Sequence, residues 1–168
     1  MRYGLRENKR IIKPNISVRK EIVHILRSIG SLECLRTAET LEADVSTTKI
    51  LQFRNLGLKV IDVVAIAAVL EQGKGISADT IRSISFSYNH LIGDLGATAL
   101  AKSLPTSICE IGFVGCGIGD TGGTEILHWM KKSPQLQMIC MEQNNFSDQL
   151  KTEFKVFKIN NPQVIVII

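Results

Sequence analysis

The residue types that could do chemistry are scattered along this chain. Three histidines, His24, His90 and His128, fall in separate segments, and no nucleophile elbow is present. For each of them a solvent-facing or packed position is a better interpretation than a catalytic one. We therefore predict no catalytic residue and no enzymatic activity.

The four cysteines also lack the spacing of a metal site. Cys34, Cys109, Cys116 and Cys140 form no C-x-x-C pair, and no histidine stands at ligand spacing from them. We expect reduced thiols, which favour a reducing compartment and a cytoplasmic location. No metal ion and no cofactor is predicted.

One glycine-rich stretch, residues 115–119, resembles a phosphate-binding loop between a strand and a helix. However, Asp120 occupies the helix start where an anion would bind, and no lysine follows as in a P-loop. The repeat described below accounts for the same glycines. We therefore favour a structural role for this loop over nucleotide binding.

Composition and charge favour a single domain with a sizeable core. The chain has 168 residues, of which 45% are hydrophobic and 21% charged, with a net charge of +4. Residues 1–20 contain seven basic residues and one acid, so the basic excess belongs to this leader. A nucleic-acid partner is not expected, because such binders spread cations over one face. No apolar run is long enough to span a membrane, and Glu7 and Pro14 disfavour a transit peptide.

A strand that turns into a helix is repeated along the chain. In residues 81–104 the apolar residues first alternate and then recur at helical spacing. Four units share this pattern, with predicted helices at 60–71, 94–104, 121–132 and 148–158 and an inserted loop at 72–79. Three apolar columns define the register: Leu51, Ile84, Ile111 and Ile139; Phe53, Phe86, Phe113 and Met141; Leu58, Leu91, Ile118 and Phe146. Units of this size must stack to bury their apolar faces, so we predict an α/β repeat solenoid.

The two ends of the repeat array have different predicted structures. Residues 1–15 form a basic leader, and residues 16–47 form a helical cap in which Gly30 ends the first helix. The repeats occupy residues 48–168 and end in an apolar strand at 164–168. An uncovered apolar edge strand pairs readily with other chains, so a homodimer through this edge is one possible assembly.

Three segments resemble the ribonuclease-inhibitor class of leucine-rich repeats. They are N-H-L-I-G-D-L-G-A at 89–97, C-G-I-G-D-T-G-G at 116–123 and N-N-F-S-D at 144–148. The resemblance implies a short horseshoe with parallel strands on its concave face and helices on its convex face. It is a resemblance to the class and to no individual protein, and Leu56 departs from it by replacing the expected Asn or Cys.

The polar positions that recur in these segments have physical reasons to be structural. Asn89, Cys116 and Asn144 can satisfy backbone groups at the bend after each strand. Asp94, Asp120 and Asp148 lie at predicted helix starts, where a carboxylate can cap free N–H groups.

The concave face is the candidate binding surface, because residues between the buried strand positions point outward there. The predicted partner-binding residues are Gln52, Arg54, Arg82, Ser85, Ser87, Tyr88, Glu110, Val114 and Glu142. Tyr88 with Arg54 and Arg82 is the group most similar to an interface hot spot. An ordinary solvated strand face is the alternative interpretation.

The leading hypothesis is a non-enzymatic scaffold that binds a protein partner on this face. GTPase-activating proteins of the Ran system resemble the same repeat class, so a GTPase regulator is a second hypothesis. A third is a structural subunit of a larger assembly. No residue of this chain can be matched to a catalytic residue of such an activator.

Overall fold

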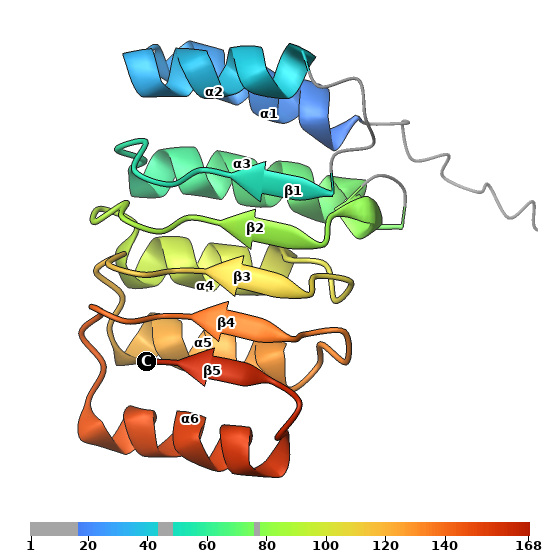
Figure 1. The fold of residues 1–168 in the computed structure, drawn as a ribbon. Coiled ribbons are helices and arrows are strands. Elements are labelled where there is room, and N and C mark those ends of the chain that lie inside the picture. Colours follow the sequence, from blue (N-terminus) through green and yellow to red (C-terminus); the bar gives the residue numbers. More distant parts are fainter. Residues whose placement is uncertain (1–16, 44–48, 76–77) are drawn as a thin grey trace, which may run out of the picture.

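The computed structural model of the chain describes residues 17–43, 49–75 and 78–168. Over these residues the protein has an α/β fold with one five-stranded parallel sheet and six α-helices (Figure 1). The strands are β1 (Ile50–Gln52), β2 (Ser83–Ser85), β3 (Glu110–Gly112), β4 (Met138–Cys140) and β5 (Ile165–Ile167). The helices are α1 (Val18–Ile29), α2 (Leu32–Ala43), α3 (Val60–Gly73), α4 (Gly93–Ser103), α5 (Asp120–Met130) and α6 (Asp148–Asn160). The predicted α/β class is confirmed.

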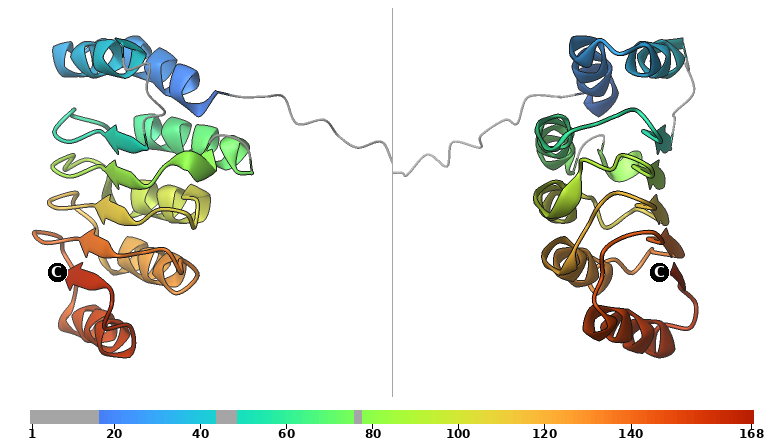
Figure 2. Two further views of the ribbon diagram at one scale, coloured as in Figure 1. Left: turned by 45° about the vertical axis from the view of Figure 1, so that its right-hand side comes forward. Right: turned by 90° about the vertical axis from the view of Figure 1, so that its left-hand side faces the viewer.

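The strands follow one another across the sheet in chain order, and each pairs in parallel with the next. Helices α3, α4 and α5 lie on one side of the sheet, and α6 lies beyond the edge strand β5 (Figure 2). Among the described residues, no α-helix covers the other side of the sheet. A parallel sheet needs a crossover between its strands, and here each crossover contains one of these helices. The uncovered side is called the strand face below.

The first two predicted columns form continuous rows inside the protein. Leu51, Ile84, Ile111 and Ile139 pair in register from strand to strand, and Val166 extends the row into β5. In the second column Phe53, Phe86, Phe113 and Met141 are fully buried. The ring centroid of Phe86 lies 5.1 Å from that of Phe53 and 5.8 Å from that of Phe113. These columns are confirmed.

The third predicted column is wrong at one position. Leu91 is 61% exposed, and Ile92 is fully buried in its place. The Ile92 N–H donates to the Asn89 carbonyl oxygen over 3.1 Å, which closes a tight turn after β2. This turn advances the chain by one residue, so Ile92 rather than Leu91 faces the core.

At the β1 end of the sheet, α1 packs against α3, and α2 packs against α1 (Figure 1). α1 ends at Gly30, whose φ of 75° is in the left-handed region and whose N–H donates to the Leu26 carbonyl, as predicted. On α2, the Cys34 thiol donates to the Leu56 carbonyl over 3.7 Å. The predicted leader, residues 1–15, lies outside the described residues, as do the last residues of the predicted cap.

At the opposite end, β5 is the edge of the sheet. Val166 is buried, whereas Ile165 and Ile167 are 54% and 40% exposed on the strand face. The homodimer through this edge stays a prediction. Within the described ranges, no helix is long and apolar enough to cross a membrane.

Candidate functional site

The loops after the strands are tied together by buried side-chain amides. Asn89 is 1% exposed. Its Oδ1 accepts from the N–H groups of Leu56 and Leu58, each over 3.0 Å. Its Nδ2 donates to the carbonyl oxygens of Phe53 and Phe86, each over 2.7 Å. One side chain therefore satisfies four buried backbone groups, two of which are donors in the preceding unit.

Asn144 repeats this arrangement between the third and fourth units. It accepts from the N–H groups of Cys116 and Ile118 and donates to the carbonyls of Phe113 and Met141, at 2.8 to 3.1 Å. Between the two amides, the Cys116 thiol donates to the Phe86 carbonyl over 3.3 Å. Burial raises the pKa of Cys116 to about 11, so the thiol keeps its proton at neutral pH. The positions predicted as a structural ladder do hold the loops together.

Two of the three aspartates predicted as helix caps, Asp94 and Asp120, bond the next unit rather than their own helices. Asp94 Oδ1 accepts from the N–H groups of Gly119 and Gly122, at the start of α5. Asp120 Oδ1 accepts from the Ser147 N–H over 2.8 Å, just before α6. The cap of α6 is Ser147, whose Oγ accepts from the Leu150 N–H. The last predicted cap residue, Asp148, is exposed and forms an ion pair with Lys151 instead, at 3.8 Å.

The contact between Asp120 and Ser147 predicts a pH effect on stability. Hydrogen bonds from the Ser147 side chain and backbone lower the pKa of Asp120 below its ordinary value of 3.8. A lowered folded-state pKa contributes stability above the unfolded pKa, and this stability is lost as the pH falls through the folded value. Asp120→Asn should therefore lower the free energy of unfolding at pH 6 but not at pH 2. Urea titrations of both proteins across this range test it, and a constant difference would contradict it.

The strand face has a centre made of small side chains. Ser83, Ser85 and Ser87 come from β2 and the residues after it, and Gly112 lies beside them on β3. A Cβ at Gly112 would lie 2.8 Å from the Ser87 Oγ and 3.0 Å from the Ser85 Oγ. The glycine therefore keeps the face hollow, and a shallow groove of about 440 Å³ runs across it. The predicted residues Gln52, Arg54, Ser85, Ser87, Tyr88, Glu110, Val114 and Glu142 all line this groove.

At the carboxyl ends of the strands, a repeated backbone turn positions the outward side chains. The third residue after each of the strands β1 to β4 has φ between 54° and 64°, in the left-handed region. These residues are Asn55, Tyr88, Gly115 and Gln143. The Arg54 guanidinium carbon lies 4.2 Å from the centroid of the Tyr88 ring. Such a stack is a cation–π contact, which holds both side chains in place at the rim of the groove.

Arg82 does not join this pair, although the sequence suggested one group of three. Its guanidinium donates to the Ser107 carbonyl over 2.8 Å, in the loop that leads into β3. Arg82 precedes β2 and Tyr88 follows it, so six extended residues, roughly 20 Å of chain, separate them. Side chains this far apart along a strand are not in contact. The predicted cluster is therefore reduced to Arg54 and Tyr88.

The other half of the groove is acidic. Glu110, Cys140 and Glu142 line it together, and burial and then the charges of Glu142 and Glu110 raise the pKa of the Cys140 thiol. One carboxylate oxygen of Glu142 is shielded from solvent and has no hydrogen-bond partner among the described residues. A shielded carboxylate oxygen is stabilised by a donor, so a binding partner could supply one here. The groove thus has a cationic, aromatic end and an acidic side.

The described ranges contain no group of three His, Cys, Asp or Glu side chains that could hold a metal ion. His90 and His128 are exposed on different elements, and His24 lies on α1. The structure does not bring these three side chains together.

The strand face offers groups for molecular recognition, namely an aromatic ring, a guanidinium, hydroxyls and carboxylates.

Comparison with known proteins places the fold only. No family model matches the chain, and no curated protein matches it. A solved structure of Chaetomium Mex67:Mtr2 subunits is similar, with a TM-score of 0.53 and 15% sequence identity, over 79% of this chain and 87% of that one. At this identity the similarity concerns the arrangement of the backbone and carries no function.

Proposed function

We propose that this protein is a non-enzymatic interaction module of the ribonuclease-inhibitor-like leucine-rich repeat class, which binds a protein partner on its strand face. The segments at 89–97, 116–123 and 144–148 support the class, since their Asn and Cys side chains bond adjacent loops. In a repeat solenoid of this kind the strand face is the concave one. Extended concave surfaces of stacked repeats are common protein-binding sites.

The observation that carries the proposal is the stack of Arg54 on Tyr88 beside the groove. Tyrosine and arginine dominate the energetics of many interfaces, because they combine large contact areas with polar ends. Here each is already ordered by the other, and the left-handed backbone at Tyr88 fixes its direction. A preordered anchor loses little side-chain entropy on binding, which favours affinity.

The test uses partners recovered with the immobilised protein, identified by mass spectrometry and purified. The double variant Arg54→Glu/Tyr88→Ala should weaken their binding at least tenfold in calorimetry, because it removes the stack and reverses the charge. Arg82→Glu is the matched control, since this exposed arginine lies at the other end of the strands. Thermal stability should be unchanged in both variants.

Two results would count against the strand face. One is unchanged affinity of the double variant for every recovered partner. The other is a loss of binding that is as large for Arg82→Glu as for the double variant, which would indicate a general charge effect.

A further inference from the structure

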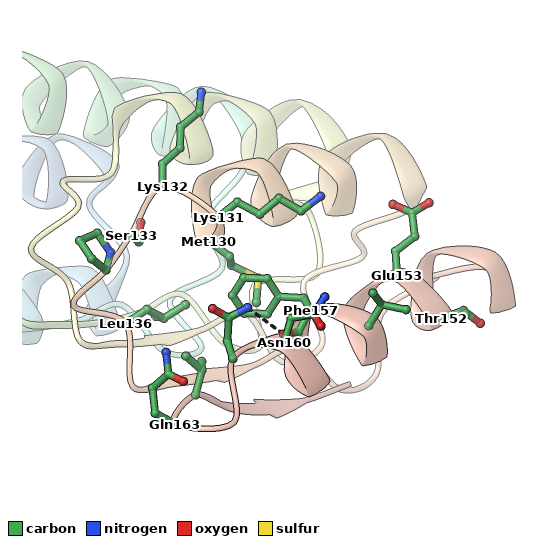
Figure 3. Close-up of a pocket in the computed structure, with 14 residues that line it drawn as sticks. Met130, Lys131, Lys132, Ser133, Leu136, Thr152, Glu153, Phe157, Asn160 and Gln163 are labelled. Carbon is green, nitrogen blue, oxygen red and sulfur yellow. Dashed lines mark hydrogen bonds between the residues drawn. The ribbon is translucent and has the colours of Figure 1, made fainter.

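A second groove lies on the helical side of the protein, between the end of α5 and the length of α6 (Figure 3). Its volume is about 730 Å³, and it shares no residue with the groove of the strand face. Its buried lining residues include Met130, Leu136, Phe157 and Val164, whereas Val156 on α6 is 51% exposed. The base of the groove is thus apolar, and Val156 adds an exposed apolar side chain to its lining on α6.

The sequence explains why this groove opens between α5 and α6. Where α4 meets α5, a Cβ at Gly122 would lie 2.9 Å from the Ala97 Cβ, so these two helices are in close contact. The residue of α6 that corresponds to Gly122 is Leu150, two positions after Asp148. A Cβ at Gly123 of α5 would lie only 2.6 Å from Leu150 Cδ2. Leu150 fills the space at the start of α6, and the groove lies further along, beside the last residue of α5 and residues 152–160 of α6.

The charges around the groove are mostly positive. Lys131 and Lys132 follow α5 on one lip and are both exposed. Glu153 is the one acidic residue among those that line the groove. Among the ion pairs of the described residues, none involves Lys131 or Lys132. Both ammonium groups could therefore form ion pairs with a ligand that covers the apolar base of the groove.

We propose that this α5–α6 groove binds an acidic amphipathic helix of a protein partner. The residues of α6 that line it recur at helical spacing from Thr152 to Asn160, so the groove is roughly 12 Å long, or about two helical turns. Apolar residues at i, i+3, i+4 and i+7 of the bound helix would cover Val156 and Phe157. Its carboxylates would pair with Lys131 and Lys132. A hollow of about 730 Å³ can take up inserted side chains, which a flat lipid surface does not supply.

The test uses a labelled 18-residue peptide with leucines at this spacing and glutamates beside them, and a control peptide with lysines in place of the glutamates. Fluorescence anisotropy should show that the full chain binds the acidic peptide at least tenfold more tightly than the basic one. Lys131→Glu/Lys132→Glu should remove this preference, and Val156→Glu should weaken binding at least fivefold. Lys20→Glu/Lys102→Glu, which makes the same charge change at exposed sites elsewhere, should bind as the unaltered protein does.

Circular dichroism would establish that every variant is folded, which the exposure of the substituted residues favours. Equal affinity for the two peptides, or equal loss in both double lysine variants, would overturn the proposal. Binding to vesicles with 30% phosphatidylserine that depends on Lys131 and Lys132, without peptide binding, would assign the surface to lipid and also overturn it. Arg54→Glu/Tyr88→Ala should leave peptide binding unchanged, so this result is independent of the strand face.

Discussion

Asn89→Ala should lower the free energy of unfolding by about 4 kcal/mol or more, because it leaves four backbone groups without their partner. Each buried donor or acceptor that loses its hydrogen bond costs about 1–3 kcal/mol. The four bonds of Asn89 are 2.7 to 3.0 Å long, and the side chain is 1% exposed. Water therefore cannot easily replace the lost amide. Urea unfolding followed by circular dichroism measures the difference.

Asn144→Ala is the matched comparison, because Asn144 makes the same four kinds of bond. Asn144 is only partly buried, so water can solvate some of the groups it leaves. The loss should be about half that of Asn89→Ala. An equal loss in the two variants, or a loss below about 1 kcal/mol at Asn89, would contradict the role of burial.

Phe86→Ala should destabilise the protein by about 3–5 kcal/mol, the usual range for a large aromatic residue removed from a core. Phe86 is fully buried between the rings of Phe53 and Phe113, so its removal leaves a cavity and breaks both ring contacts. Urea unfolding is again the measurement. Phe86→Leu is the control, since it keeps most of the apolar volume and should lose less than half as much. Equal losses would contradict a contribution from the cavity, because both variants lose the ring contacts and only Phe86→Ala leaves a large cavity.

The strand positions could be predicted from the sequence because their period is short and repeated. Leu51, Ile84 and Ile111 each lie between two outward residues, and each is followed at the same sequence spacing by a buried Phe. A period that recurs in several units fixes the register of a parallel sheet, since one slipped residue would turn every side chain over. The α/β class and the starts of the helices followed from this pattern.

The loops could be predicted less well, because a turn changes which residue faces inward. The register placed Leu91 in the core, but the turn between Asn89 and Ile92 gives that place to Ile92. The spacing alone cannot reveal this turn, since Leu91 and Ile92 are both apolar. The same limit applies to Arg82, which lies at the opposite end of β2 from Tyr88 and bonds the Ser107 carbonyl.

Contacts between units could not be predicted from one unit alone. Asp94 lies at the start of α4, where a cap for its own helix is the simplest expectation, yet its carboxylate bonds the start of α5. The groove between α5 and α6 is a similar case. The exchange of a glycine for Leu150 is visible in the sequence, but its effect depends on how two helices approach each other.

The side-chain hydrogen bonds between neighbouring units also limit how the number of residues in this protein could change during evolution. Asn89, Asp94 and Asp120 each need a receiving loop in a neighbouring unit. A duplication or deletion of a whole unit keeps each bonding side chain next to a loop that it can bond, at both new junctions. A recombination within a unit separates them, so viable length variants should differ by complete units.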